Sequence, residues 1–444
     1  MRTLITQRMN DYTAAKEELL RKNDYIAPLL YNEYGVKKGL RDEKGNGVLA
    51  GLTNISKVTS FKTVDRQRVP CDGELWYRGY RIENLLKDLG HGYGYEKIAY
   101  LLITGEMPDR ETEKEFFDIL AQSRTLPSNF TRDVIMKAPS GDIMNSITKS
   151  ILTLASYDEK VSDTSIPNTL RQCIGLIAQF PMLAVYAYHA HNYYNNGDSM
   201  LIHRPDPELS TAENILMMLR PGKDYTPTEA KVLDTALILH MEHGGGNNST
   251  FTTRVITSAG SDTYSTVAAA MSSLKGPKHG GANMKVMEMM DNIRENVGPN
   301  HDRNVLERYL EKIVDKEAFD RKGLIYGMGH AVYSLSDPRE KVFKQYVEEL
   351  AIEKGRENDL RLYSDIEELA PKIIAEKRRI FKGVSPNVDF YSGFVYDMLG
   401  IPKELYTPIF AIARIVGWSA HRIEELICTD KIIRPAYMSV MEEH

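Results

Sequence analysis

Apolar residues recur every three or four positions along most of the chain, the spacing that gives an α-helix one buried face. Strand-like patterns are confined to two short stretches at 48–56 and 74–77, with a turn expected at Asp72-Gly73. The sequence therefore predicts a mainly helical, all-α protein. The expected helices cover residues 12–22, 82–89, 95–104, 110–124, 144–156, 169–188, 208–219, 227–241, 263–274, 282–296, 304–316, 339–355, 360–381, 391–399 and 408–428.

Length and glycine spacing predict more than one domain. A chain of 444 residues exceeds what one ordinary hydrophobic core encloses. Glycines cluster near 276–281, 323–329 and 393–400, as expected of hinges between a larger and a smaller domain, although glycines also end helices. The polar stretch 195–207 is typical of a surface excursion between two helices.

Composition narrows the classes of protein. Hydrophobic residues make up 42% and charged residues 26% of the chain, which is the profile of a soluble globular protein. The formal net charge is −5, which argues against a protein that binds nucleic acid or an anionic membrane, while leaving room for a local basic pocket. Neither a nucleic acid nor a membrane is therefore expected as a partner.

Cysteine usage and the remaining apolar runs fit a cytoplasmic protein. Cys71, Cys173 and Cys428 lie far apart and lack the spacing of zinc ligands or of a disulfide framework. The first ten residues have no apolar core of the kind that a secretory signal needs. The apolar run 174–188 contains Gln179 and is too short to span a bilayer, so we expect a buried helix there.

The segment 274–283 breaks one helical run and opens another, with His279 held at the break between glycines. A histidine just before a helix start feels the positive end of the helix dipole, which disfavours its protonation. A neutral imidazole there could donate a hydrogen bond to a carbonyl that is becoming an enolate. The alternative is a turn in which His279 only packs or caps.

A second pair of histidines, His240 and His243, ends a predicted helix and is followed by three glycines. Two histidines three residues apart share a helix face, so a divalent metal is one reading. No third ligand stands at a zinc-type spacing, and no metal is expected. The glycine run favours close approach of the backbone to a ligand, and a pair of core histidines is the other alternative.

A third glycine-framed histidine, His330, precedes a strong helix-start signal. Asp337 suits an N-cap, and Glu340 suits the first turn of the helix that follows. Arg339 then lies in a first turn, where the dipole disfavours a cation, so an anion is expected to bind beside it. A surface pairing of Arg339 with Glu340 or Glu242 is the alternative.

The C-terminal quarter supplies a carboxylate and two arginines. Asp389 could act as a general base, although it would serve equally well as the N-cap of the helix that follows it. Arg414 is the single charge in the apolar stretch 408–416, so something anionic must meet it, either a structural carboxylate or a ligand. Arg434 is a further candidate anion contact, unless it is simply solvated.

These segments together resemble the citrate synthase family. The resemblance runs from about residue 45 to the end and rests on six motifs. They are GPKHGGAN (276–283), GMGHAVYSLSDPR (327–339), PNVDFYSG (386–393), HMEHGGGN (240–247), LWYRGY (75–80) and the C-terminal pair Arg414 and Arg434-Pro435.

The resemblance implies a role for each motif residue. Catalytic roles would fall to His279, His330 and Asp389. Contacts to oxaloacetate would come from His243, Arg339, Arg414 and Arg434, the last reaching in from the second subunit of a homodimer. Coenzyme A would be met by Leu324, Tyr326, Gly327, Met328, Gly329 and Lys382, with Arg378 or Arg379 as further basic candidates.

The resemblance also implies the architecture and the reaction. A large domain (46–280 and 400–444) and a small domain (281–399) would enclose a cleft, preceded by a helical extension (1–45). The enzyme would be an acyltransferase of the tricarboxylic acid cycle that condenses acetyl-CoA, its cosubstrate, with oxaloacetate and water, without a tightly bound cofactor.

Two alternatives and three departures remain. A 2-methylcitrate synthase would use propionyl-CoA on the same scaffold, and a metal- or nucleotide-binding helical protein without turnover would explain the histidine pair alone. Gly244 replaces a commonly acidic residue and Ser334 a commonly basic one, and the 195–207 excursion is long. The change at Ser334 leaves the phosphate contacts undetermined.

Overall fold

The computed structural model describes residues 6–42, 47–64, 67–89, 93–298, 301–329, 332–333, 335–378, 384–428 and 430–441. The chain divides into two compact units, Met1–Leu52 and Thr53–His444. The first unit contains α1 (Gln7–Asn23), α2 (Pro28–Glu33) and the short 3₁₀ turn η1 (Lys38–Leu40). Neither α1 nor α2 buries a side chain, so the 444-residue chain has its hydrophobic core in the second unit.

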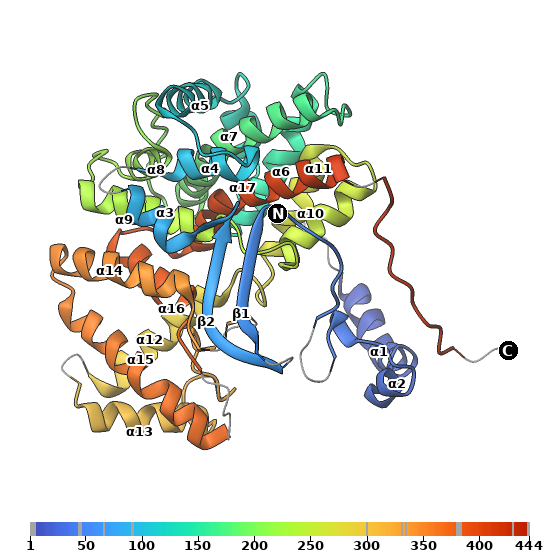
Figure 1. Ribbon diagram of the computed structural model, residues 1–444, viewed down its shortest axis with the longest axis vertical. Helices are drawn as coiled ribbons and strands as arrows, with labels where there is room; N and C mark the ends of the chain where they lie inside the picture. Colours follow the sequence, from blue (N-terminus) through green and yellow to red (C-terminus); the bar gives the residue numbers. More distant parts are fainter. Residues whose placement is uncertain are drawn as a thin grey trace. The chain divides into compact units, whose positions relative to one another are not determined.

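The second unit is built around two apolar helices, α7 (Ile166–Asn195) and α17 (Tyr406–Cys428), which pack against each other. Figure 1 shows α17 crossing the middle of the surrounding helices. Those helices are α3 (Ile82–Leu89), α4 (Tyr95–Thr104), α5 (Arg110–Ser123), α6 (Ile143–Leu154), α8 (Thr211–Leu219), α9 (Pro227–His240), α10 (Asn248–Ser258) and α11 (Thr263–Leu274). Short helical turns lie at η2 (Thr131–Ile135), η3 (Ala155–Tyr157) and η4 (Lys403–Leu405).

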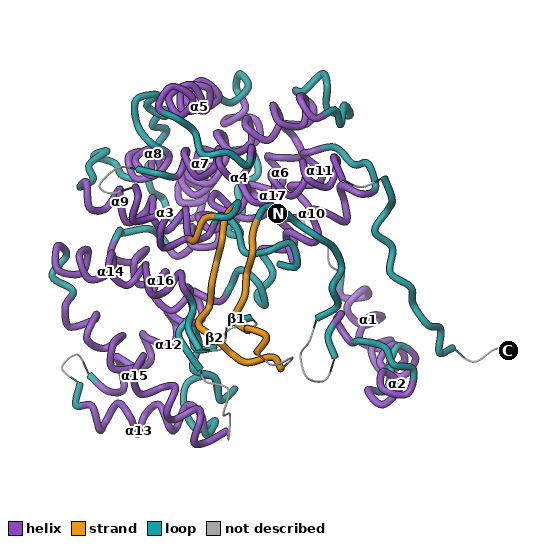
Figure 2. The backbone as a smooth tube through the Cα atoms, in the orientation of Figure 1, coloured by secondary structure: helices purple, strands orange, loops and turns teal. Residues whose placement is uncertain are grey.

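A second group of helices forms the other end of this unit, where α14 and α16 pack together and α12 packs against α16. Its members are α12 (Ala282–Val297), α13 (Arg303–Val314), α14 (Pro338–Glu353), α15 (Glu357–Arg378) and α16 (Val388–Met398). The predicted mainly helical fold is confirmed (Figure 2). The expected division into a large and a small domain at 280/281 and 399/400 stays a prediction.

A three-stranded antiparallel sheet, in the order β1-β2-β3, runs beside both helix groups (Figure 2). Its strands are β1 (Ser56–Val64), β2 (Gln67–Tyr77) and β3 (Tyr80–Arg81). The Ser60 hydroxyl donates to the carbonyl of Val332 at 2.6 Å, and the Gly73 amide donates to the carbonyl of Ser336 at 3.2 Å. The hairpin therefore ties the main helical body to the loop that precedes α14.

The strand boundaries predicted from the sequence were partly wrong. The first strand begins at Ser56, where the expected one ends, because the pairing with β2 selects the register rather than the local pattern. Asp72-Gly73 lies inside β2, where the register shifts opposite Thr59 and Phe61, and makes no turn. Glycine is required here because a Cβ at Gly73 would lie 2.3 Å from the carbonyl oxygen of Ser336.

Two helices depart from the sequence prediction. The helix expected at 169–188 extends over the whole of α7 despite Pro181, and 78% of its apolar window is buried inside the protein, as a core helix requires. α10 was not expected, because its sequence is rich in β-branched threonines that disfavour helix. Four of its residues are buried, so tertiary packing outweighs the weak local propensity.

Candidate active site

His279 lies in the tight connection between α11 and α12. The Gly280 amide donates to the Leu274 carbonyl at 2.9 Å, and a Cβ at Gly280 would lie 2.4 Å from that oxygen, so the turn needs glycine. The ring Nε2 lies 3.1 Å from the Ser249 hydroxyl, which accepts a hydrogen bond from the Trp418 indole at 3.1 Å. Burial, assisted by the positive charge of Arg414, lowers the pKa of His279 to about 4. The ring is therefore neutral at pH 7, for reasons that do not need the helix dipole.

Asp389 occupies the first turn of α16. The N-cap is Asn387, whose side-chain oxygen accepts a hydrogen bond from the Asp389 amide at 3.0 Å. The capping role considered for Asp389 is thus filled by another residue. Burial raises the pKa of the Asp389 carboxyl to about 6, and the positive charges of Arg339 and Arg414 oppose this rise. The carboxylate is ionised near neutrality and has the proton affinity of a working base.

Arg339 is buried at the start of α14 and forms a bidentate ion pair with the N-cap carboxylate of Asp337. Its Nε and Nη2 lie 3.0 and 2.7 Å from the two carboxylate oxygens. The side chains of Arg339 and Asp337 are 4% and 0% exposed. The expected anion is therefore present within the protein, and it is neither Glu340 nor Glu242.

Arg414, by contrast, has a charge that no carboxylate neutralises directly. It is 1% exposed, and its Nε donates to the His240 carbonyl at 2.7 Å. Its Nη1 has no hydrogen-bond partner, and no acidic oxygen among the described residues lies within 4.0 Å of its guanidinium. Burial lowers its pKa to about 10, while the charges of Glu242 and Asp389 favour the cation.

Tyr333 brings the histidine loop next to the start of α14. Its ring lies edge-on to His243, with centroids 5.4 Å apart, and the guanidinium of Arg339 lies 5.9 Å from the same ring. His243 is buried just beyond α9. The structure thus brings His243, Arg339 and Arg414 from three distant parts of the sequence into one charged neighbourhood with Asp389 and His279.

The glycine segment 327–329 lies directly beside the start of α16. The amides of Gly329 and Asn387 donate to the carbonyls of Ser385 and Gly327 at 2.7 and 2.9 Å, so the two segments pair. Gly327 has φ +81°, and a Cβ there would lie 2.8 Å from the Phe390 ring. Met328 pairs with Pro386, and Tyr326 donates to Asp320 at 2.6 Å. A bare backbone edge therefore runs close to Asp389.

Other predicted site residues are not joined to this cluster. Arg434 is exposed in the extended segment after α17, and Leu324 is 42% exposed. The guanidinium of Arg378 donates to the carbonyl of Gly323. His330, Ser334, Arg379 and Lys382 lie outside the described residues.

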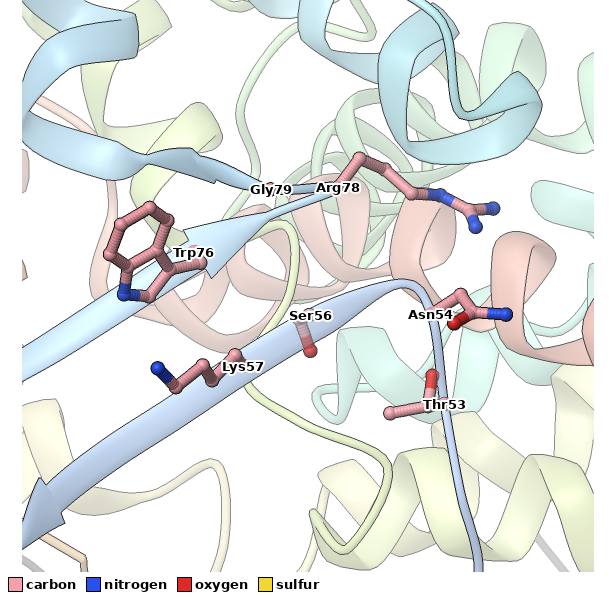
Figure 3. Close-up of a pocket in the computed structure, with 7 residues that line it drawn as sticks. All are labelled: Thr53, Asn54, Ser56, Lys57, Trp76, Arg78 and Gly79. Atoms are coloured by element: carbon pink, nitrogen blue, oxygen red, sulfur yellow. The ribbon is translucent and has the colours of Figure 1, made fainter.

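A surface hollow of about 250 Å³ lies at the start of β1, beside the Arg78-Gly79 turn (Figure 3). None of the predicted site residues lines it, and the hydroxyl of Ser56, which does, donates to Glu242 at 2.9 Å. Within the described part of the chain, no three His, Cys, Asp or Glu side chains gather as a metal site.

Three residues of this neighbourhood were missed by the sequence reasoning. Ser249 and Trp418 support His279, and Asp337 was assigned only as a helix cap. Ser249 stands two residues beyond the HMEHGGGN motif, and its full burial is invisible in a sequence that reads as non-helical there. The Asp-Pro-Arg spacing could have indicated the ion pair, because a cap carboxylate reaches the side chain two residues on.

Comparison with known proteins gives the same picture. The profile of the family described as "Citrate synthase, C-terminal domain" matches residues 44–436. The citrate synthase of Synechocystis is 36% identical over 374 residues, covering 83% of this chain and 85% of the relative. The 2-methylcitrate synthase 2 of Corynebacterium glutamicum is 31% identical over 404 residues, covering 90% and 93%.

A solved structure agrees in fold. The citrate synthase of Thermoplasma acidophilum, determined as a ternary complex with carboxymethyl coenzyme A and oxaloacetate, superimposes with a TM-score of 0.73 at 26% identity. The match covers 91% of this chain and 97% of that one. Sequence and fold agree, and this chain belongs to the citrate synthase family of acyltransferases.

Proposed function

We propose that this protein is a citrate synthase, which condenses acetyl-CoA with oxaloacetate and hydrolyses the resulting thioester. The observation that carries the proposal is the buried Arg414, whose Nη1 lacks a partner although Asp389, Arg339 and His279 lie close enough to interact with it electrostatically. A buried guanidinium without a counter-ion is costly, and a substrate carboxylate would supply one. Bidentate recognition of a carboxylate suits arginine better than lysine.

The first chemical step is removal of a proton from the methyl group of the thioester. The Asp389 carboxylate takes the proton, and the electron pair moves onto the thioester oxygen to give an enolate. Neutral His279 donates a hydrogen bond to that oxygen. A neutral imidazole carries one ring proton, which His279 would donate in this role.

The enolate carbon then attacks the ketone of oxaloacetate, and the new alkoxide takes a proton from His330. His243, Arg339 and Arg414 would hold the carboxylates of oxaloacetate, with Arg434 entering from a second subunit. Water hydrolyses the citryl thioester to citrate, coenzyme A and a proton. No metal or prosthetic group has a part in these steps.

The acyl-CoA would lie along the bare backbone of the 327–329 segment. Gly327, Met328 and Gly329, with Leu324 and Tyr326 before them, would contact the adenine end, and Lys382 the phosphates. The pairing of this segment with 385–387 supports the assignment, because it brings this stretch of backbone close to Asp389. The Thermoplasma relative binds a coenzyme A analogue and oxaloacetate together.

Assembly and location complete the proposal. A homodimer is needed for Arg434 to act, since this residue is exposed within its own chain. Closure of a small domain (281–399) on a large one would exclude water from the enolate. The three cysteines are free, which supports a cytoplasmic location.

One assay tests the reaction and the choice of acyl group. Free thiol is followed after mixing the protein and oxaloacetate with acetyl-CoA or with propionyl-CoA, each with and without a chelator. We expect faster release from acetyl-CoA, insensitive to the chelator. Faster release from propionyl-CoA would identify a 2-methylcitrate synthase. The free-energy difference that selects between the two acyl groups is small, because burial of one extra methylene contributes only about 0.8 kcal/mol. Silence with both thioesters would refute an enzymatic role.

A further inference from the structure

A buried chain of polar side chains lies behind His243. It consists of Glu242, His421 and Arg254, and is closed by Glu424 and Glu425; we call it the relay. Glu242 stands on the loop after α9, Arg254 on α10 and the other three residues on α17. None of them has a role in the chemistry proposed above. The inference drawn from them rests on that proposed function, because it concerns how oxaloacetate is held.

The tautomer of His421 follows from its neighbours. Arg254 directs Nε and Nη2 at the ring Nδ1, at 3.1 and 2.6 Å. A guanidinium can only donate hydrogen bonds, so Nδ1 must carry a lone pair. The single ring proton is then on Nε2, which lies 3.0 Å from a carboxylate oxygen of Glu242. The Nε2 side of His421 therefore faces Glu242, in a close polar contact that lacks hydrogen-bond geometry.

The far end of the relay fixes Arg254. Its Nη1 donates to Glu425 at 2.8 Å, and its Nη2 contacts Glu424. Both acidic residues lie near the end of α17, one turn beyond His421, so one helix holds the arginine at two points. This leaves Arg254 little freedom to turn away from the ring.

The near end of the relay fixes the loop after α9. One Glu242 oxygen accepts hydrogen bonds from the Gly244 amide at 2.5 Å and from the Ser56 hydroxyl at 2.9 Å. Glu242 and His421 are both 0% exposed. Burial opposes ionisation of Glu242, whereas the neighbouring His421, the positive charge of Arg414 and the hydrogen bond from Ser56 lower the pKa of its carboxyl. Gly417 admits the carboxylate, since a Cβ there would lie 2.5 Å from it.

This loop carries two contacts to the substrate site. The His240 carbonyl holds the Nε of Arg414, and His243 follows Glu242 directly. Gly244 has φ +86°, a left-handed conformation that favours glycine. Its amide donates a hydrogen bond to Glu242, which stabilises this turn. The Tyr77 hydroxyl lies 3.1 Å from each of the carbonyl oxygens of Ile238 and Glu242, which share its single proton. Glu242 therefore sits between the two groups that face the carboxylates of oxaloacetate.

We propose that Glu242, His421 and Arg254 are positioning residues for oxaloacetate: His421, oriented by Arg254, holds Glu242 so that the loop presents His243 and orients Arg414. The relay touches neither substrate nor reacting atoms. It acts on oxaloacetate binding and leaves acyl-CoA binding and the proton transfer by Asp389 largely untouched. A merely structural network would lower stability without separating the two substrates.

Two substitutions of His421 separate the two halves of the relay. In His421→Asn the side-chain oxygen can replace Nδ1 as the acceptor for Arg254, but the donor to Glu242 is lost. In His421→Gln the amide nitrogen can replace Nε2 as that donor. Glu242→Gln removes the negative charge at the near end of the relay. His189→Asn is the matched control, since His189 is a buried core histidine on α7 whose Nε2 lies 3.2 Å from the Met218 carbonyl.

Steady-state kinetics on the full-length enzyme give the first readout. We expect His421→Asn and Glu242→Gln to raise the KM for oxaloacetate about 10-fold, the effect of losing one hydrogen bond to a charged group, with the KM for acyl-CoA changed less than about twofold. His421→Gln should recover most of the loss. His189→Asn should lower thermal stability without changing either KM. Equal behaviour of His421→Asn and His421→Gln, or a parallel rise of both KM values, would overturn the proposal.

Amide hydrogen exchange of the 240–247 segment gives a second readout that needs no substrate. We expect faster exchange in His421→Asn and Glu242→Gln than in the wild type or in His421→Gln, because the Gly244 amide loses a firmly held acceptor. Unchanged exchange in all variants would refute the relay. If the wild-type protein releases no thiol, the proposed function is overturned. The exchange rates would still show whether the relay holds the 240–247 segment.

Discussion

Two buried arginines, predicted to hold the same substrate, sit in opposite electrostatic settings. At the start of α14, Arg339 is matched by the bidentate carboxylate of Asp337, two residues before it. In the middle of α17, Arg414 has a backbone carbonyl and an unpartnered Nη1. The charge of Arg339 is therefore neutralised without a ligand, whereas Arg414 keeps a hydrogen-bond donor that no described residue meets.

The difference separates stability from binding. Removing one partner of a buried pair leaves an uncompensated charge, so Arg339 contributes strongly to folding. Removing a buried cation that has no counter-ion relieves a desolvation cost, so Arg414 contributes little to folding or even opposes it. Arg414 keeps an unpartnered donor although the charges of Glu242 and Asp389 favour its cation, and a bound carboxylate would supply the missing partner.

In the proposed reaction the two arginines hold oxaloacetate and Asp389 removes the proton, so loss of the base should leave oxaloacetate binding intact. Asp389→Asn should lower kcat by about 10²–10⁴-fold, the usual size of a general-base contribution, while oxaloacetate still binds. Thiol release measures the first effect, and calorimetric titration with oxaloacetate measures the second. Near-normal turnover would reduce Asp389 to a structural residue.

Arg339→Gln should be the most destabilising change of the two arginine sites. It leaves Asp337 buried without a counter-charge, at a cost of about 3–5 kcal/mol in the free energy of unfolding, measured by urea denaturation. The control is Lys341→Gln on the same helix, which breaks an exposed ion pair with Asp72 and should cost less than about 1 kcal/mol. Similar losses in the two variants would contradict the contrast.

Arg414→Gln should show the opposite profile. The KM for oxaloacetate should rise about 10- to 100-fold, because a charged hydrogen-bond donor to the substrate is lost, with the free energy of unfolding nearly unchanged. Arg422→Gln is the control on α17, since Arg422 is satisfied by Thr257, Thr263, Thr266 and the Ser261 carbonyl. That variant should lose stability and keep its KM. A large stability loss in Arg414→Gln would mean that its charge has a structural partner.

The smallest effect concerns pH. Asp389 acts as a base only when ionised, and burial raises its pKa to about 6, so kcat/KM should fall as the pH drops through that value. Asp337 adds to the rise, so Asp337→Asn should lower the pKa of Asp389 and move the acid limb to lower pH by less than about one unit. An acid limb that stays in place or moves upward would show that Asp337 does not act on the base.

Helix α10 was not predicted from the sequence. Its threonines and valine hid the helix, and with it Ser249, which supports His279, and Arg254, which orients His421. The glycines near 393–400 were expected to form a hinge, yet Gly393 lies inside α16, where a Cβ would lie 2.8 Å from Met287. A glycine at a hinge and a glycine at a close helix contact look alike in a sequence, so the glycine pattern alone could not distinguish these two roles.

Local sequence patterns were enough to predict the helical class of the fold, the helix start at Asp337 and the candidates His279, Asp389, Arg339 and Arg414. These follow from local periodicity, capping preference and the cost of burying charge, which neighbouring residues reveal. Only the tertiary structure decided that Asp337 neutralises Arg339, that Asn387 frees Asp389 from capping, and that Arg414 keeps an unpartnered donor. Counter-charges and desolvation depend on distances through space, and residues far apart in the chain set them.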